Sequence, residues 1–304
     1  MKNIRLSYKY IRLLSLSNTQ GGIVKKIILI LFSISLLSVT AIGNAKSIRI
    51  GTEGAYPPWN NLNSAGELEG AEIDFGNEAC ARMGVECEWV TQDWDGIIPA
   101  LLQGKYDIII AGMSITEERK EKVNFTNGYM TDGARFAVMK GSGLEGLSVS
   151  KFTGGVNKVN LNNAGGKEQA AIGQLIAAMQ GSTVCVQSST IHQNFLEKHM
   201  SGAVKVKLYQ SVDDHNLDLR AGRCDAVLAD VGSIIDFMES DGGVDVAFTG
   251  PTFSGGVFGD GVGGAVRKED TDILEMWNEA IAAMSADGTT AEITKKWFGR
   301  DISM

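Results

Sequence analysis

The fold is decided by the stretch WDGIIPALLQGKYDIIIAGMS, residues 94–114. Its first part has the apolar spacing of a helix over 94–102, a turn led by Gly104 follows, and a run of apolar residues covers 106–111. A short apolar run bounded by turn residues is typical of a buried strand. The stretch therefore predicts one helix-to-strand unit of an α/β sheet.

The same alternation of elements extends in both directions from this stretch. Two short segments match in order, Gly104-Lys105-Tyr106-Asp107 and Gly222-Arg223-Cys224-Asp225, and each leads into an apolar run. Alternating strands and helices indicate parallel sheets covered by helices. We therefore predict two similarly built α/β lobes, with strands at 48–52, 87–91 and 106–111, then 183–187, 204–209 and 225–229, and helices at 74–83 and 94–102, then 192–198 and 212–220.

Two segments interrupt this alternation. Residues 141–181 are rich in Gly, Asn, Ser and Lys, and we interpret them as a surface insertion near the lobe junction, with an amphipathic helix at 167–179. Residues 253–264 are rich in glycine, but no Gly-Lys-Ser/Thr follows, which argues against a phosphate-binding loop. Glycines that let the chain cross back between the lobes explain this segment better.

Composition and charge limit the function classes. The chain has 304 residues, 44% hydrophobic and 21% charged, which is ordinary for a globular protein and excludes disordered, collagenous and multi-span membrane classes. Residues 1–45 contain six basic and no acidic residues, so the remaining chain carries a formal charge of −14. A body this acidic repels phosphate backbones and anionic lipid surfaces, and we expect no nucleic-acid partner.

The N-terminal segment has the order of a secretory signal. Lys25-Lys26 precede the apolar run 27–39, and small residues follow up to Ala45, where we predict cleavage. A membrane anchor is the alternative, but the run is about 13 residues where a span needs about 20. We further hypothesise that residues 1–23 are not translated and that Val24 is the start; intact mass of the unprocessed precursor tests this.

Export makes the four cysteines disulfide candidates. Four cysteines allow three connectivities. Cys80 ends a predicted helix and Cys87 begins the next strand, so a local bridge between them is geometrically easy. Adjacent parallel strands could bring Cys185 and Cys224 together, but buried free thiols are equally consistent with the sequence. No Cys/His spacing suggests zinc, and we expect neither a metal nor a cofactor.

Several longer motifs together resemble one family, the polar amino-acid family of periplasmic solute-binding proteins, which are the receptors of ABC importers. The motifs that carry the resemblance are Ile48–Trp59 (IRIGTEGAYPPW), Gly70–Phe75 (GAEIDF), Trp94–Leu101 (WDGIIPAL), Asp107–Arg119 (DIIIAGMSITEER), Ala221–Asp225 (AGRCD) and Ala286–Thr289 (ADGT). Within the family the chain looks most similar to the lysine/arginine/ornithine/histidine receptors and to the opine (octopine, nopaline) receptors.

The resemblance implies a type II periplasmic-binding-protein fold. Its lobes would be a mostly parallel sheet each, lobe 1 from residues 46–138 plus 256–304 and lobe 2 from 139–255, after a signal peptide at 1–45. A two-segment hinge near 134–141 and 253–264 would let the lobes close on a ligand. The resemblance also implies a periplasmic protein, which we expect to be a monomer, with an inner-membrane ABC permease as its partner.

An amino acid buried between lobes needs a partner for each of its charges, because an unpaired buried charge is prohibitive. The resemblance implies that Arg119 binds the α-carboxylate and Asp230 the α-ammonium. It also implies hydrogen bonds from Ser114 and from the backbone around Gly112 and Met113. The alternatives are a helix-surface role for Arg119 and a helix N-cap role for Asp230.

The other end of the expected pocket would bind the ligand side chain. Glu53 follows the first strand, where α/β sheets place ligands, and an acid there calls for a cationic tail. Tyr56 and Trp94 can flank a planar guanidinium, although core packing or a rigid turn would also explain them. The turn after the strand at 183–187 adds polar contacts. The residues expected from that turn are Gln187, Ser189 and Thr190.

Arginine is the ligand that this set favours, with lysine, ornithine or histidine as other basic candidates. The chain departs from the usual pattern of basic amino-acid receptors at Ala111-Gly112, where serines are usual, and at Ile191, where a hydroxyl is expected. An opine receptor is therefore one alternative. A periplasmic dehydratase of the cyclohexadienyl type is another, and it would need Glu53 as a proton-transferring acid. We do not expect an enzyme, because a cation partner explains Glu53 better.

Overall fold

The computed structural model describes residues 47–147 and 155–304. The predicted export signal at 1–45 lies outside the described residues, as do residues 148–154 of the predicted insertion. Within the described ranges, no helix combines the length and the apolar character that a membrane crossing requires.

The first lobe is built on a five-stranded sheet in the order β5-β1-β6-β14-β7. Strands β5, β1 and β6 are parallel, as predicted, and β14 runs antiparallel to both its neighbours. Strand β14 differs because the chain reaches it on returning from the other lobe. The bounds are β1 (Ser47–Thr52), β5 (Glu86–Thr91), β6 (Ile108–Ile109), β7 (Asn124–Phe125) and β14 (Ala265–Val266).

Side-chain alternation divides the core of this lobe into two layers. Ile108 and Ile110 pack in one layer with α2, α9 and α10, whereas Ile109 packs in the other with α3. A small antiparallel sheet, β2-β3-β4, lies beside them. The remaining bounds are β2 (Ala55–Tyr56), β3 (Asn60–Leu62), β4 (Leu68–Glu69), α2 (Ala71–Met83), η2 (Trp94–Gly96), α3 (Ile97–Leu102), α4 (Glu117–Lys120), α9 (Thr271–Ala286) and α10 (Thr289–Phe298).

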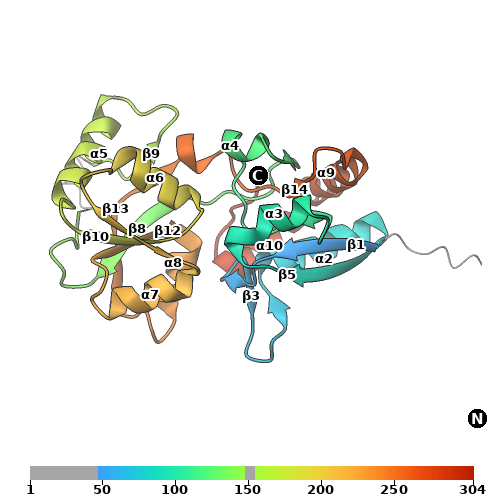
Figure 1. Cartoon of the computed structure of the whole chain (residues 1–304), viewed down its shortest axis with the longest axis horizontal. Helices are drawn as coiled ribbons and strands as arrows, with labels where there is room; N and C mark the ends of the chain where they lie inside the picture. The colour runs from blue at the N-terminus through green and yellow to red at the C-terminus, as the bar shows by residue number, and fades with distance from the viewer. Residues whose placement is uncertain (1–46, 148–154) are drawn as a thin grey trace, which may run out of the picture. The chain divides into compact units, whose positions relative to one another are not determined.

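The second lobe is built on a six-stranded sheet in the order β11-β10-β12-β8-β13-β9. Strands β11, β10 and β12 are parallel, as predicted, and β8 is antiparallel to β12 and β13. Helices α5 and α6 cover one face and α7 and α8 the other (Figure 1). The bounds are β8 (Ala134–Met139), β9 (Lys158–Asn160), α5 (Gly166–Ala178), β10 (Thr183–Gln187), α6 (Ile191–His199), β11 (Lys205–Tyr209), α7 (Val212–Arg220), β12 (Ala226–Asp230), α8 (Val231–Glu239), β13 (Val246–Ser254) and η3 (Gly256–Phe258).

The chain crosses between the two sheets twice. Strand β8 lies in the second sheet with hydrogen-bonded neighbours on both sides, so the first crossing precedes Ala134. This corrects the predicted boundary at residue 138 and the predicted hinge at 134–141, because a strand paired on both sides cannot bend freely. On the return, Phe258 still packs in the second core, whereas Val262 bridges to Ser114 and Met130 of the first lobe. The second crossing is therefore at residues 259–261.

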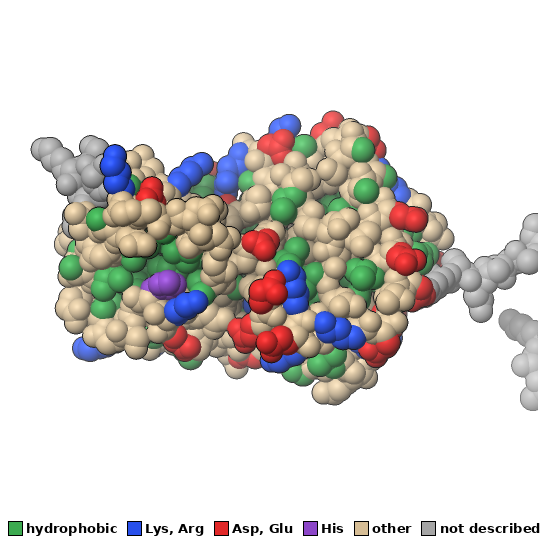
Figure 2. Space-filling view, turned by 90° about the horizontal axis from the view of Figure 1, so that it is seen from above, with side chains coloured by type: hydrophobic (Ala, Val, Ile, Leu, Met, Phe, Trp, Pro, Cys, Tyr) green, Lys and Arg blue, Asp and Glu red, His purple; other side chains and the backbone are tan. Residues whose placement is uncertain are grey.

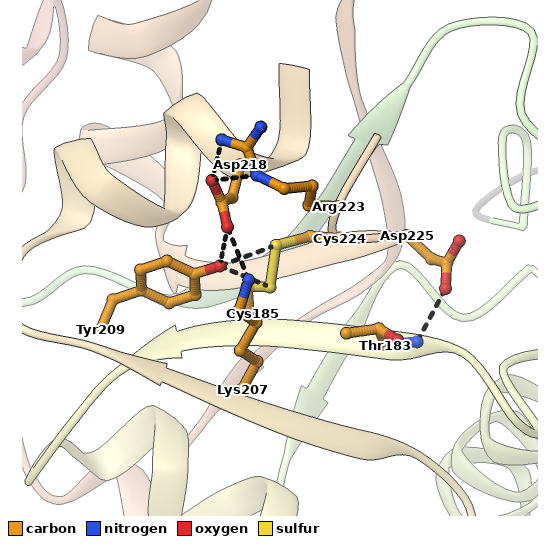
Figure 3. The surroundings of a disulfide bond; sticks show 8 residues. All are labelled: Thr183, Cys185, Lys207, Tyr209, Asp218, Arg223, Cys224 and Asp225. Carbon is orange, nitrogen blue, oxygen red and sulfur yellow. Dashed lines mark hydrogen bonds and ion pairs between the residues drawn. A yellow bond between two sulfur atoms is a disulfide. The ribbon is translucent and has the colours of Figure 1, made fainter. Parts of the chain in front are cut away.

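Two disulfides join the four cysteines. Cys80 and Cys87 are bridged with their Cα atoms 6.2 Å apart, as predicted. Cys185 in β10 and Cys224 just before β12 are also bridged, with Cα atoms 5.9 Å apart, which settles the pairing that the sequence leaves open. Beside the second bridge, the Asp218 carboxylate accepts hydrogen bonds from Lys207, Tyr209 and Arg223 (Figure 3). The bridge fixes the start of β12 to β10, which ends at the candidate site, and the Asp218 hydrogen bonds fix α7 to β11.

The second disulfide is expected to stabilise the protein more than the first. It closes a 39-residue separation against seven for the other, and chain-entropy arguments then give about 4 kcal/mol against about 2.5 kcal/mol. Chemical denaturation of the Cys185→Ala/Cys224→Ala and Cys80→Ala/Cys87→Ala double variants measures both losses. The ranking would be contradicted if the Cys185→Ala/Cys224→Ala variant lost no more stability than the Cys80→Ala/Cys87→Ala variant.

Candidate ligand-binding site

The candidate site is a narrow pocket between the two lobes. Several of its residues stand at or just after the carboxyl ends of parallel strands in the two sheets, where α/β folds place ligands. Glu53 follows β1, and Asp230 ends β12. The lining residues are Glu53, Tyr56, Trp94, Ala111, Gly112, Ser114 and Arg119 from the first lobe, and Gln187, Thr190, Ile191, His192 and Asp230 from the second.

Arg119 supplies the positive end of the pocket. It lies in α4, whose N-cap Thr116 side chain accepts a hydrogen bond from the Arg119 amide. The guanidinium donates to the Ser114 carbonyl at 3.0 Å and stands 5.2 Å from the Trp94 ring centroid. Among the described residues it makes no ion pair, and burial lowers its pKa to about 10 against the pull of Glu118 and Asp230. The Arg119 guanidinium is therefore held in one orientation and is available to pair with an anionic group of a ligand.

Asp230 supplies one negative group. Its Oδ2 accepts a hydrogen bond from the Tyr56 hydroxyl at 2.7 Å, and its Oδ1 lies 3.2 Å from His192 Nε2. Asp230 occupies the N-cap position of α8, but its side chain makes no capping hydrogen bond. The Gly232 amide donates instead to Asp132 at 2.6 Å. Asp230 is therefore the N-cap of α8 by position only, and its carboxylate lines the pocket without making the side-chain bond of a cap.

Glu53 supplies the second negative group, and it is only 9% exposed. Gln187 Nε2 of the other lobe donates to Glu53 Oε1 at 2.6 Å. Burial raises the pKa of Glu53 to about 7, the Gln187 hydrogen bond opposes this rise, and the carboxylates of Asp93, Asp95 and Asp213 add to it. Four acidic groups thus make this end of the pocket unfavourable for a further anion and favourable for a cation.

A buried carboxylate fixes the loops that carry these residues. Glu72 is 0% exposed, and it accepts hydrogen bonds from the Gly112 amide at 2.7 and 2.8 Å, from Tyr129 at 2.5 Å and from Asn60 at 2.9 Å. Asn60 in turn accepts from the Gly54 amide at 2.8 Å. Because Glu72 already takes the Gly112 amide, the hydrogen bonds expected from the backbone around Gly112 and Met113 would have to come from other groups of this segment. Gly112 has φ +60°, a conformation that favours glycine.

Tyr56 and Trp94 stand at the charged groups of the protein itself. Tyr56 donates to Asp230, and the Trp94 ring carries the Arg119 guanidinium. Trp94 Nε1 also donates to the Ser189 carbonyl of the other lobe at 3.1 Å. These contacts orient Asp230 and Arg119, the two groups that would bind the ligand backbone. The sequence had suggested instead that Tyr56 and Trp94 flank the guanidinium of the ligand tail.

The pocket brings together all of the expected site residues except Met113 and Ser189. Met113 is 0% exposed and packs in the core around α3, so it does not reach the pocket. Ser189 turns away, and its amide donates to Gln193. Both line a neighbouring cavity instead. His192 also lines the pocket, and the sequence analysis did not predict it. Its position two residues after Thr190, where the strand passes into the helix, could have indicated it.

Comparisons with known proteins agree with one another. Residues 48–300 match the family described as bacterial extracellular solute-binding proteins, family 3. The octopine-binding periplasmic protein of Rhizobium meliloti is 38% identical, with 86% of this chain and 94% of that protein covered. The L-arginine-binding protein of Pseudomonas aeruginosa is 37% identical, with 89% and 95% covered.

A solved structure shows the same fold. It is a periplasmic His/Glu/Gln/Arg/opine family-binding protein from Silicibacter pomeroyi in complex with lysine. It superimposes with a TM-score of 0.66 at 33% identity, and the match covers 84% of this chain and 99% of that one. The two-lobe fold predicted from the sequence is thereby confirmed.

Proposed function

This chain belongs to family 3 of the bacterial extracellular solute-binding proteins, and we propose that it captures a basic amino acid, arginine foremost, for an ABC importer. The observation that carries the proposal is the charge pattern of one pocket. It holds a cation with no ion-pair partner among the described residues, Arg119, together with two buried carboxylates, Asp230 and Glu53. A ligand with one negative and two positive groups complements this pattern.

The assignment of ligand groups follows from the surroundings of each charge. The α-carboxylate would pair with Arg119, whose planar guanidinium suits a carboxylate. The α-ammonium would pair with Asp230. A guanidinium tail would reach Glu53, where neighbouring acids keep the field negative and Gln187 offers a further polar group. Lysine, ornithine and histidine carry shorter or smaller cations, so we place arginine first.

Contacts across the cleft support a closing mechanism. Tyr56 donates to Asp230 across the cleft, and Gln187 donates to Glu53. Ser188 adds a hydrogen bond to Asp95 at 3.0 Å. Because the ligand-binding groups themselves make these contacts, a ligand that bridges them would favour the closed form. Bending at residues 131–133 and 259–261 would open it. The closed monomer would then dock on an inner-membrane ABC permease in the periplasm.

The surface fits a partner other than nucleic acid. On the face shown in Figure 2, basic side chains stand singly or in small groups beside acidic ones. Residues 46–304, which include the described ranges, carry a formal charge of −14. Repulsion from a phosphate backbone would therefore dominate at long range.

A dehydratase on the same scaffold is the alternative from another class. The pKa of Glu53, raised to about 7, is what a proton-transferring acid would need. The named relatives are binding proteins, however, and the Gln187 contact explains Glu53 as part of a ligand-closing pair. We therefore propose a receptor without catalytic activity, with no cofactor and no metal.

A ligand screen tests the proposal directly. Thermal shifts with arginine, lysine, ornithine, histidine, glutamine, octopine and nopaline should be largest for arginine, because ligand at about 1,000 times its Kd stabilises by about 4 kcal/mol. Calorimetric titration then gives the affinity. A larger shift with octopine or nopaline would favour the opine alternative. Turnover of prephenate or arogenate would favour the dehydratase and overturn the receptor.

A further inference from the structure

We propose that Asp132 is a positioning residue, which caps helix α8 in place of Asp230 and thereby leaves the Asp230 carboxylate free for the ligand ammonium. The inference rests on the proposed function, because the assignment of the ammonium belongs to it. Asp132 lies in the first crossing between the lobes, outside the pocket lining, and its side chain is 2% exposed. Its Oδ2 accepts a hydrogen bond from the Gly232 amide of α8 at 2.6 Å.

The start of α8 needs acceptors for its first amides, because a buried amide without a partner is costly. Gly232 is buried at the second position of this helix. The amide before it, that of Val231, donates to the Gly133 carbonyl at 2.8 Å. Two neighbouring residues of the crossing, Asp132 and Gly133, therefore satisfy the first two amides of α8.

Asp230 is the natural competitor for this task. It occupies the N-cap position of α8, and Asp is among the residues that cap best, by accepting from the second or third amide of a helix. Its backbone already has the extended conformation of a cap, with φ −63° and ψ 146°. A side-chain rotation would therefore let Asp230 accept the Gly232 amide if that amide lost Asp132. In the structure the Asp230 carboxylate instead meets Tyr56 and His192.

The competition between the two carboxylates matters most before a ligand is bound. Tyr56 belongs to the first lobe, so its hydrogen bond to Asp230 is lost when the lobes open. The residues that follow Asp132 are bonded to the second lobe, because Gly133 accepts from the first residue of α8 and Ala134 pairs with Asp230. Asp132 can thus keep its bond to α8, and keep Asp230 available, in the open protein.

The same carboxylate also makes a contact with the first lobe. Arg300, which follows α10, donates from Nη2 to Asp132 Oδ1 at 2.8 Å. A substitution at either residue therefore changes a contact between the lobes as well. Altered closure shifts the affinity of all ligands by the same factor. The test must compare two ligands that differ only in the ammonium group.

The experiment measures calorimetric Kd values for arginine and for 5-guanidinopentanoate, which is arginine without its α-ammonium group. At about pH 8 the carboxyls of Asp132 and Glu53 are largely ionised, since burial raises their pKa values to about 6 and about 7. The preference for arginine, expressed as the ratio of the two Kd values, should fall about fivefold in Asp132→Ala, which corresponds to the loss of a typical cap.

Two further variants separate the cap from the charge and from closure. Asp132→Asn removes the same charge but keeps an oxygen that can accept from the Gly232 amide, so it should recover most of the preference. Arg300→Gln removes the contact with the first lobe and leaves the cap, so the preference should match the wild type even if both Kd values shift. Equal preferences in Asp132→Ala and Asp132→Asn would overturn the inference.

A second measurement does not depend on how the Asp132 variants fold. A crystal structure of the ligand-free wild-type protein should show the Gly232 amide bonded to Asp132 and the Asp230 carboxylate still beside His192. A bond from the Gly232 amide to Asp230 in that structure would overturn the inference. Absence of arginine binding to the wild type at about pH 8 would instead overturn the proposed function, and the ligand-free structure would still test the cap.

Discussion

Replacement of Arg119 by alanine is expected to abolish measurable binding of every amino-acid ligand. Its guanidinium is held by the Ser114 carbonyl and the Trp94 ring, and within the described chain it has no anionic partner of its own. A ligand carboxylate that loses this partner would be buried unpaired between the lobes. Truncating one side of such a pair costs about 4 kcal/mol, which is about a thousandfold in Kd.

A matched control separates the site effect from a general charge effect. Lys120→Ala removes a positive charge one residue away, where Lys120 pairs with Glu117 at the surface. We expect Kd to change less than about threefold in this variant, because exposed ion pairs contribute little. Calorimetric titration with arginine and glutamine measures both variants. Wild-type affinity in a folded Arg119→Ala chain would remove Arg119 from the site.

Replacement of Glu53 by glutamine is expected to weaken arginine binding about thirtyfold at about pH 8, with much smaller losses for glutamine. The variant keeps a hydrogen-bonding group beside Gln187 but loses the charge that a cationic tail needs. At about pH 5.5 the difference from the wild type should shrink, because the pKa of Glu53 is about 7 and the wild-type carboxyl is then protonated.

Although Glu53→Gln should weaken arginine binding, it should raise the free energy of unfolding of the ligand-free protein. In the folded protein the pKa of Glu53, about 7, lies above its ordinary value of 4.5. The folded state therefore binds more protons between these values, and the free energy of unfolding falls as pH rises through them. Without ligand, Glu53→Gln should be more stable than the wild type at about pH 8.

Glu67→Gln is the matched control for both measurements. Glu67 lies exposed between β3 and β4, outside the pocket lining. Its substitution removes one negative charge from the same lobe and should leave arginine affinity and its pH dependence unchanged. Equal losses for arginine and glutamine in Glu53→Gln would contradict the proposed role of Glu53 at the ligand tail.

Much of the fold could be predicted because local signals agreed with the tertiary result. The apolar run after Gly104 gave β6, and the matching run after Gly222 gave β12, each preceded by its helix. The start of α2 was predicted less well, because the helix begins at Ala71 and the sequence analysis placed its start at Asp74. Gly70 begins it with φ +128°, and a Cβ there would lie 2.4 Å from the Trp59 carbonyl. That contact comes from elsewhere in the chain.

The sequence by itself determined the kinds of element, their order and the charged residues available for a ligand, because periodicity and turn chemistry are local properties. Only the tertiary structure decided which groups remain free for that ligand. Glu72 takes the Gly112 amide, the β8 pairings move the first crossing before Ala134, and His192 meets Asp230 across 38 residues of sequence. These outcomes depend on contacts between segments distant in the chain, and no local pattern encodes such contacts.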